Sequence, residues 1–170
     1  MTNIEIKARS ERADEIREIL KSHHAEFIGV DHQKDTYFKV NHGRLKLREG
    51  NIENHLIYYE RENISGPKQA SIILFRSDPS SSLKKILERS LGILVVVNKI
   101  REIYFIANIK FHIDHLEDLG EFIEIEAIDE YESIGREKLL EQCKTYMVLF
   151  HISDDDLIKS SYSDLLLNNE

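Results

Sequence analysis

The chain has 170 residues and a net charge of −8, with 41% apolar and 32% charged residues. This composition excludes a disordered chain, and we expect residues 1–170 to form a single domain that includes the tail from about 150 to 170. The acidic balance argues against general binding to nucleic acid. No apolar run could span a bilayer and the polar start does not resemble a signal peptide, so we expect a cytoplasmic protein without a membrane partner.

The first half of the chain predicts one helix among several strands. Residues 2–9 predict a strand, and the amphipathic pattern from Glu11 to Lys21 predicts a helix that Ser10 caps. Strand-like stretches follow at 26–31, 34–40, 43–49, 54–62 and 69–76. The turn-like breaks between several of them are typical of an antiparallel meander.

The second half predicts a similar mixture. A short helix is expected at about 81–91, where Gly92 ends it. We expect strands at 93–98, 99–106, 108–115 and 121–128, then a helix from about 132 to 149 that places Cys143 in the core, and a helical tail opened by Asp154 to Asp156. Eight or nine strands in two groups favour an α+β fold, an antiparallel β-barrel with helices packed outside.

Charged and apolar residues alternate in four of these segments. They are Asn3-Ile4-Glu5-Ile6-Lys7, Arg44-Leu45-Lys46-Leu47-Arg48, Asn98-Lys99-Ile100-Arg101 and Glu124-Ile125-Glu126. Alternate residues of a strand share a face, so each segment has a charged face and an apolar face. If the apolar residues Ile4, Ile6, Leu45, Leu47, Ile123 and Ile125 pack against helices, the charged residues point into the barrel. A solvated strand face would explain any one segment, but it explains all four less well, and we predict a barrel whose interior is a charged tunnel.

The charges in these segments have both signs. Arginine and lysine bind phosphate oxygens, and carboxylates hold Mg²⁺, which often bridges to phosphates as well. The pattern therefore favours a polyphosphate ligand together with its metal. The eight histidines have no recurring metal-ligand spacing, which argues against zinc.

The same segments resemble the CYTH, or triphosphate tunnel metalloenzyme, superfamily, most closely its class IV adenylyl cyclase-like branch. The superfamily signature is Glu-x-Glu-x-Lys on the first strand, and this chain keeps Glu5 and Lys7 but has Asn3 at the first position. Further matches are Lys34-Asp35-Thr36-Tyr37-Phe38, Gly43-Arg44-Leu45-Lys46-Leu47-Arg48, Tyr59-Glu60-Arg61, Gly66-Pro67-Lys68, His112-Ile113-Asp114 and Leu119-Gly120-Glu121-Phe122. The resemblance covers nearly the whole chain. It implies an eight-stranded tunnel that binds a nucleotide or inorganic triphosphate with Mg²⁺ or Mn²⁺, and it also implies a homodimer.

By this resemblance, eight cations are expected to bind the triphosphate. They are Lys7, Arg44, Lys46, Arg48, Arg61, Lys68, Lys99 and Arg101. Lys7, Lys99 and Arg101 are also the expected catalytic residues, because cations neutralise the charge that develops in phosphoryl transfer. The expected metal ligands are Glu5, Asp114, Glu124 and Glu126, since Mg²⁺ needs few carboxylates when water and phosphate complete its shell.

Some of these residues have other possible roles. Lys68 follows a Gly-Pro turn and could be a solvated loop residue, while Arg61 and Lys46 could form ion pairs with Glu60 or Glu49. His112 shares a strand face with Asp114, and packing or a hydrogen bond is a simpler role for it than proton transfer.

Three functions stay open at this point. The first is metal-dependent conversion of ATP to cyclic AMP and pyrophosphate, and the second is hydrolysis of a nucleoside, thiamine or inorganic triphosphate. The third is a non-catalytic binder of triphosphate or polyphosphate. Asn3 favours the third function, because a neutral amide binds Mg²⁺ more weakly than a carboxylate does.

Overall fold

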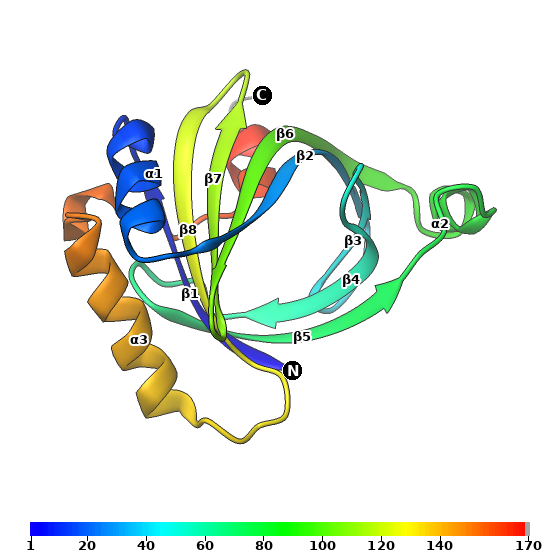
Figure 1. The fold of residues 1–170 in the computed structure, drawn as a ribbon. Helices are drawn as coiled ribbons and strands as arrows, with labels where there is room; N and C mark the ends of the chain where they lie inside the picture. Colours follow the sequence, from blue (N-terminus) through cyan, green and yellow to red (C-terminus); the bar gives the residue numbers. More distant parts are fainter. Residues whose placement is uncertain (169–170) are drawn as a thin grey trace.

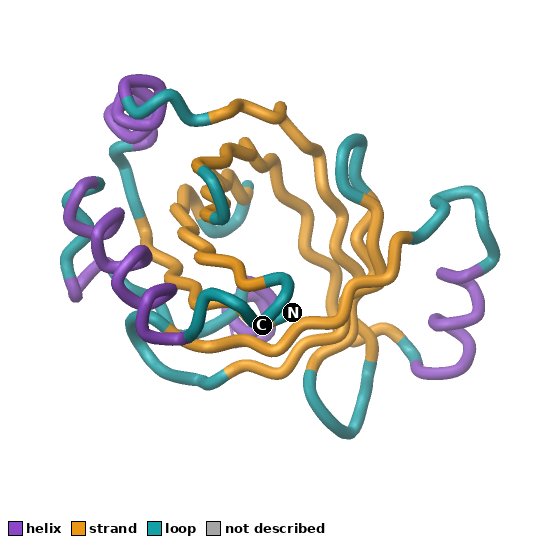
Figure 2. Tube along the Cα trace, turned by 60° about the horizontal axis from the view of Figure 1, so that its bottom comes forward, coloured by secondary structure: helices purple, strands orange, loops and turns teal. Residues whose placement is uncertain are grey.

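A computed structural model describes residues 1–168, and within them eight antiparallel strands close into a barrel (Figures 1 and 2). The strands are β1 (Thr2–Arg9), β2 (Glu26–Phe38), β3 (Arg44–Glu49), β4 (Asn54–Arg61), β5 (Lys68–Arg76), β6 (Ile93–Ile106), β7 (Ile109–Leu116) and β8 (Gly120–Asp129). Their order around the barrel is β1-β5-β4-β3-β2-β6-β7-β8. The predicted α+β fold with an eight-stranded antiparallel barrel is confirmed.

Strands β2 and β6 are each continuous where the sequence predicted two shorter strands. They pair with each other from Glu26 opposite Phe105 to Phe38 opposite Ile93. An irregularity between Phe27 and Gly29 lets β2 bend, and Gly29 takes a φ of 146° that side chains rarely adopt. Strands of a barrel are tilted against its axis, and these two long strands join its two halves.

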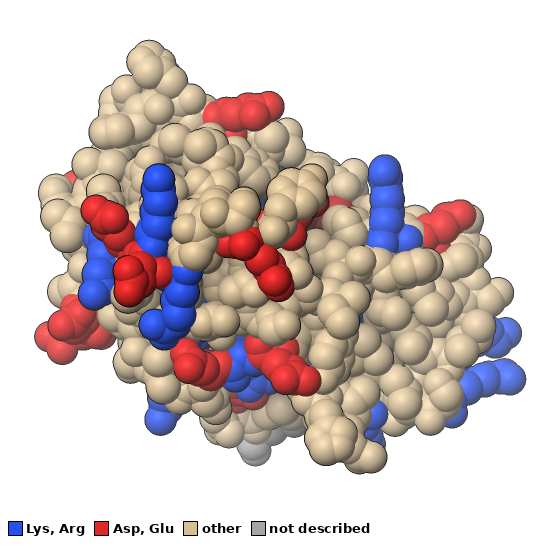
Figure 3. Space-filling model, turned by 90° about the horizontal axis from the view of Figure 1, so that it is seen from below, with Lys and Arg blue, Asp and Glu red and all other residues tan. Residues whose placement is uncertain are grey.

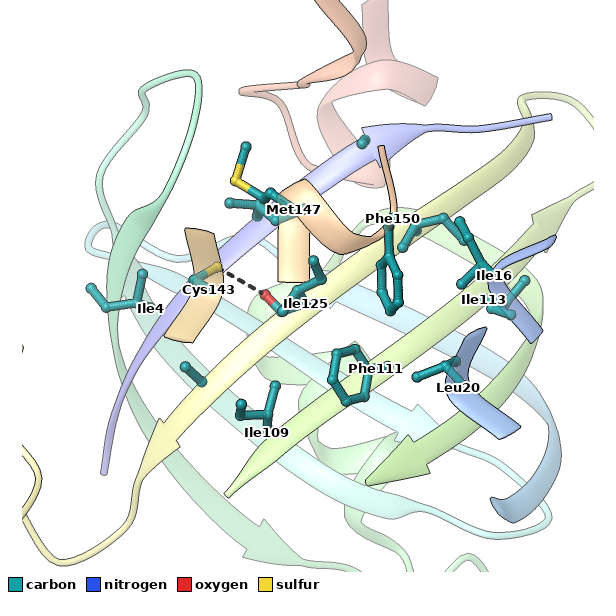
Figure 4. Close-up of a cluster of buried hydrophobic side chains, with 14 of the residues drawn as sticks. Ile4, Ile16, Leu20, Ile109, Phe111, Ile113, Ile125, Cys143, Met147 and Phe150 are labelled. Carbon is teal, nitrogen blue, oxygen red and sulfur yellow. Dashed lines mark hydrogen bonds between the residues drawn. The ribbon is translucent and has the colours of Figure 1, made fainter. Parts of the chain in front are cut away.

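An apolar core lies between one side of the barrel and the helices α1 (Ala13–Ser22) and α3 (Arg136–Leu149) (Figures 1 and 4). The outward residues of β1, β7 and β8 supply it, among them Ile4, Phe111 and Ile125. Cys143 is buried there as predicted, with its Sγ 3.9 Å from the carbonyl oxygen of Ile125. The alternation of these strands therefore separates an apolar outer face from the lumen.

Two details of this side differ from the sequence predictions. Helix α1 begins at Ala13, and Ser10 does not cap it, because its hydroxyl accepts the N–H of Arg12 before the helix starts. Of the apolar residues expected under the helices, Leu45 and Leu47 lie outside this core cluster, and Leu45 is partly exposed.

Helix α3 begins at Arg136, four residues later than predicted. The carboxylate of Asp129 accepts the backbone N–H groups of Ser133, Ile134 and Gly135, which holds the preceding segment in a turn. Gly135 has a φ of 88°, so the helix cannot extend through it.

The remaining helices lie on the other sides of the barrel. Helix α2 (Leu83–Leu91) ends at Gly92 as predicted. The tail forms a short 3₁₀ turn, η1 (Asp154–Asp156), and helix α4 (Tyr162–Asn168), which lies behind β6 and β7 toward the end opposite the N-terminus (Figure 1). The last residues of the predicted tail, 169–170, are outside the described part. None of the helices within residues 1–168 is long and apolar enough to cross a membrane.

Candidate functional site

The inner face of the barrel encloses a cavity of about 340 Å³. Nine of the predicted site residues line it: Glu5, Lys7, Lys46, Arg48, Arg61, Lys99, Arg101, Glu124 and Glu126. Strand alternation brings them together, because each shares the inward face of its strand. Three predicted residues do not line this cavity: Arg44 lines a separate pocket, and Lys68 and Asp114 are buried in the barrel wall.

Asp35 of β2 holds one group of cations in the lumen. Its carboxylate is buried and accepts Arg48 Nε at 2.9 Å and Nη2 at 2.8 Å. The ammonium groups of Lys46 and Lys99 lie 3.0 and 2.9 Å from Asp35 Oδ2. Burial acts to raise the pKa of Asp35, but the positive charges of Arg48, Lys46 and Lys99 hold this pKa well below its usual range. Sequence reasoning gave Asp35 no role, although its position between Gln33 and Tyr37 on the inward face of β2 was a usable signal.

Asp114 of β7 fixes the guanidinium of Arg101 in a second group. Arg101 donates to both Asp114 oxygens, at 2.7 and 2.6 Å, in the bidentate geometry that arginine forms with carboxylates. The hydroxyl of Tyr162, from α4, donates to Asp114 Oδ2 at 2.7 Å. Arg101 also reaches Glu124 Oε2 at 2.9 Å. Both Asp114 oxygens are therefore engaged by protein donors.

Three carboxylates and an imidazole lie together in the lumen. Lys7 Nζ is 3.0 Å from Glu124 Oε1, and Arg61 Nη1 is 2.6 Å from Glu5 Oε1. Among residues 1–168, Glu126 has no lysine or arginine within ion-pair distance. Burial, followed by the nearby charges of Glu5 and Glu124, raises the pKa of Glu126 to about 7. Glu126, a partly buried carboxylate beside two others, lacks a cation partner among residues 1–168, and the donor set therefore fits a divalent metal.

His112 completes this group. Its Nδ1 lies 3.0 Å from Glu124 Oε2 and 3.7 Å from Glu126 Oε1, and the ligand atoms of the three residues lie within 4.8 Å of one another. Burial, assisted by the charge of Arg101, lowers the pKa of His112 to about 3, so the imidazole is neutral. A neutral imidazole can donate to Glu124 or bind a metal.

An ion-pair cluster that the sequence did not predict lies nearer the N-terminal end of the tunnel. Glu53, from the turn between β3 and β4, pairs with Arg48 at 3.0 Å and with Lys110 of β7. Arg48 and Lys110 act against the effect of burial and lower the pKa of Glu53. Strand alternation could not locate Glu53, because a turn residue has no fixed face. Seen from this end, the molecule carries charged side chains of both signs among largely uncharged surface (Figure 3).

The alternative roles considered for three cations are resolved by their contacts. Lys46 and Arg61 do form ion pairs, but with Asp35 and Glu5 and not with Glu49 or Glu60. Lys68 is not a solvated loop residue. It is buried and donates to the carbonyl oxygens of residues 158 and 159, at 3.1 and 2.9 Å, and burial lowers its pKa to about 8.

Two further residues lie at the edges of this site. Arg44 pairs with Asp164 of α4 at 2.8 Å. Asn3 is buried on the same strand face as Glu5 and Lys7, and its side-chain oxygen has no hydrogen-bond partner within the described residues. An unpaired buried amide oxygen is costly, so the Glu-to-Asn departure from the superfamily signature leaves a polar group that a ligand or water can satisfy.

A closed eight-stranded barrel with cations and carboxylates inside it is the tunnel architecture expected from the sequence. The CYTH domain profile matches residues 1–161, and the chain belongs to this family. It is 28% identical to a "Putative adenylate cyclase" of Methanocaldococcus jannaschii, over 97% of this chain and 98% of that protein. The predicted family is thus confirmed.

Solved structures share the fold. A "putative adenylate cyclase" from Vibrio parahaemolyticus has a TM-score of 0.75 at 20% identity and covers 98% of both chains. A "Putative adenylyl cyclase" from Hippeastrum, described with a dominant triphosphatase activity, has a TM-score of 0.63 at 12% identity, with 99% of this chain and 96% of that chain covered.

Proposed function

We propose that this protein is a divalent-metal-dependent enzyme that converts ATP to cyclic AMP and pyrophosphate. The observation that carries the proposal is the order of groups along the lumen. Lys7 and Lys99 lie at the end closed by Tyr162, with their ammonium groups 3.6 and 5.5 Å from its ring centroid. Phe122 of β8 contacts Tyr162 at this end. Glu126 is the second inward residue after Phe122 along β8, so it lies further from the closed end, and it has no lysine or arginine partner within residues 1–168.

This order suits a triphosphate that enters with its terminal phosphate first. The β- and γ-phosphates would meet Lys7, Lys99 and the cations held by Asp35, and the α-phosphate would lie beside Glu126, nearer the open end. Attack by the ribose 3′-hydroxyl at the α-phosphorus would then release pyrophosphate into the cationic end. Arg101 and Lys99 would neutralise the negative charge that grows on the leaving group.

Glu5, Glu124 and Glu126 are the residues that would hold Mg²⁺ or Mn²⁺. Such an ion supplies Lewis-acid stabilisation of charge on phosphate oxygens. We assign Asp114 a different role from the one predicted. Since its oxygens are engaged by Arg101 and Tyr162, it positions Arg101 toward the lumen and is not a metal ligand.

Hydrolysis of the terminal phosphate is the second candidate. It is favoured by the triphosphatase activity described for the Hippeastrum protein of the same fold. The two reactions need the same cations and carboxylates and differ in which phosphorus lies beside Glu126.

Product analysis tests the proposal. Purified protein is incubated with ATP or inorganic triphosphate and Mg²⁺ or Mn²⁺, and the products are separated by chromatography. Cyclic AMP with pyrophosphate is the expected result, and orthophosphate would instead establish the triphosphatase. Glu126→Gln and Lys7→Ala are expected to remove activity without loss of the circular dichroism signal of the folded protein. An unchanged rate in either variant would contradict these roles.

Asn3→Glu tests the non-catalytic alternative. If wild type gives no product although triphosphate raises its melting temperature, and Asn3→Glu gives turnover, the natural chain is a binder and the enzymatic proposal is wrong. Strong turnover by wild type removes that alternative.

A further inference from the structure

The two ends of the tunnel differ in how they meet solvent. At the end near the N-terminus, the cavity is lined by the exposed Glu130 and by Leu74, which is 48% exposed. At the other end, the inward residues Val97 and Phe122 are buried, and Tyr162 of α4 is only 3% exposed. Within residues 1–168 the tunnel therefore has an open mouth and a closed end.

Apolar packing closes that end. Tyr162 packs with Phe122 at 5.0 Å between ring centroids, and both belong to a cluster of inward residues that includes Val97 and Leu116. Leu165 and Leu166 of α4 pack against the same cluster from outside. A phosphate could not enter this packing without losing its hydration and finding no donor in return.

The chain segment that carries Tyr162 is fixed to the barrel wall. Leu157 forms a bridge with Ala8 of β1, and the N–H of the next residue donates to the carbonyl oxygen of Lys7 at 2.9 Å. Lys68 holds two carbonyl groups of the same segment, and Arg44 pairs with Asp164 of α4. These contacts come from β1, β3 and β5, so the closure is part of the barrel's construction.

Tyr162 also marks where the cationic lining stops. Lys7 Nζ lies over its ring, and its hydroxyl is fixed by Asp114. The ammonium groups of Lys7 and Lys99 lie near this ring in the lumen, whereas Val97, Leu116 and Phe122, which belong to the same cluster as Tyr162, do not line the cavity. The Tyr162 ring thus lies at the closed end of the cavity, next to Lys7 and Lys99, which are the last cations that a phosphate chain can reach.

We propose that the tunnel is a dead end that accepts only the free end of a linear phosphate chain, with Tyr162 as the stop that sets how many phosphates fit. This inference rests on the proposed triphosphate site and adds a rule for its substrates. Chains cannot thread through the barrel, so a long inorganic polyphosphate binds only through its two ends. Internal phosphates of such a chain contribute nothing to occupancy of the lumen.

A titration with phosphate chains of different lengths tests this rule in the wild-type protein, because it shows whether binding follows the concentration of chain ends or of total phosphate. Tripolyphosphate and polyphosphates of several narrow length classes are titrated in the presence of Mg²⁺, and the melting temperature is recorded. When concentration is expressed as chain ends, the midpoints are expected to coincide for all lengths. Midpoints that coincide only when concentration is expressed as total phosphate would overturn the inference. If neither ATP nor tripolyphosphate shifts the melting temperature, the proposed function itself fails, which is a distinguishable result.

Variants of Tyr162 test the stop. Tyr162→Ala removes the ring and leaves space beside Lys7 and Lys99 that a hydrated phosphate can occupy, so it is expected to raise the affinity for adenosine 5′-tetraphosphate relative to ATP at least severalfold. Tyr162→Phe keeps the ring and loses only the bond to Asp114, so its ratio should equal that of wild type. Equal ratios in all three proteins, or the same change in both variants, would contradict the assignment. If Tyr162→Ala does not fold, the end-counting experiment decides alone.

Discussion

The two faces of β8 are both largely buried, yet different forces hold them. The outward residues Ile123 and Ile125 lie in the apolar core that α1 and α3 cover, whereas Glu124 and Glu126 face charged neighbours in the lumen. Burial of apolar area is favourable wherever it occurs. Burial of charge has a large desolvation cost that an ion pair often only offsets. The outer face therefore stabilises the barrel, and the inner face is a costly arrangement that a phosphate ligand and its metal would complete.

The largest expected effect comes from breaking a buried ion pair on the inner face. Arg101→Ala leaves the buried Asp114 carboxylate without its bidentate partner, which should lower the free energy of unfolding by about 3–5 kcal/mol. Urea unfolding measures this. The double variant Arg101→Met, Asp114→Leu should recover most of the stability but not ATP binding. If the double variant binds ATP as wild type does, Arg101 is not a phosphate ligand.

A truncation on the outer face should lower the stability of the protein without changing its affinity for ATP. Ile125→Ala removes buried methyl groups between β8 and α3 and is expected to cost about 2–5 kcal/mol of unfolding free energy. Titration calorimetry below the melting temperature should still give the wild-type affinity for ATP. A large loss of affinity would show that the two faces are not separable.

The pH dependence of stability isolates Glu126. Its pKa is about 7 in the folded protein against 4.5 for the ordinary group, so the folded state keeps a proton that the unfolded state has released. The contribution of Glu126 to the stability of the metal-free protein should therefore fall as pH rises from about 4.5 to about 7, by up to about 3 kcal/mol. His112, whose pKa is lowered to about 3, contributes in the opposite direction up to about pH 6.5, so the Glu126 contribution is measured as the difference between wild type and a Glu126 variant. Urea unfolding in a chelator at several pH values measures the slope.

Two variants sharpen this prediction. The stability of Glu126→Gln relative to wild type should rise as pH rises from about 4.5 to about 7, because the variant lacks the raised pKa. Glu121→Gln changes an exposed residue on the other face of β8, and its difference from wild type should not change with pH. A difference between Glu126→Gln and wild type that is constant with pH would contradict the assignment.

The smallest effect is expected at the partly exposed ion pair between Arg17 of α1 and Glu102 of β6, at 2.6 Å. Arg17→Met should change the unfolding free energy by less than about 1 kcal/mol, because solvent screens the pair. ATP binding should be unaffected. A larger loss in urea unfolding would mean that this contact is essential to α1 docking.

The number and grouping of the strands predicted a barrel, the family resemblance implied eight strands, and alternation identified most of the charged lumen. Alternation placed Lys7, Arg48 and Glu126 on inward faces, because a strand has only two faces and the apolar residues occupy one. It did not reveal which charges neutralise each other. The partners of Asp35 lie on other strands, and pairing depends on register that a single sequence does not specify, so its inward position alone did not reveal its role. Glu53 was missed because it lies in a turn, which has no fixed face.

The closed end could not be predicted for a similar reason. Tyr162 lies in a short tail helix, and its local sequence gives no sign that it packs inside the barrel against Phe122. The division of β2 and β6 into shorter predicted strands also reflects local reasoning, since polar residues within a strand resemble a boundary. Only closure of the barrel requires those strands to continue.

The most direct test of the account is whether the inner face, and not the outer one, binds a triphosphate. ATP is titrated calorimetrically with excess Mg²⁺ into wild type, Lys7→Met and Ile6→Val, which change adjacent residues on opposite faces of β1. The account predicts equal binding by wild type and Ile6→Val and at least about tenfold weaker binding by Lys7→Met, as expected for loss of a charge-assisted contact. Unchanged binding by Lys7→Met would contradict it.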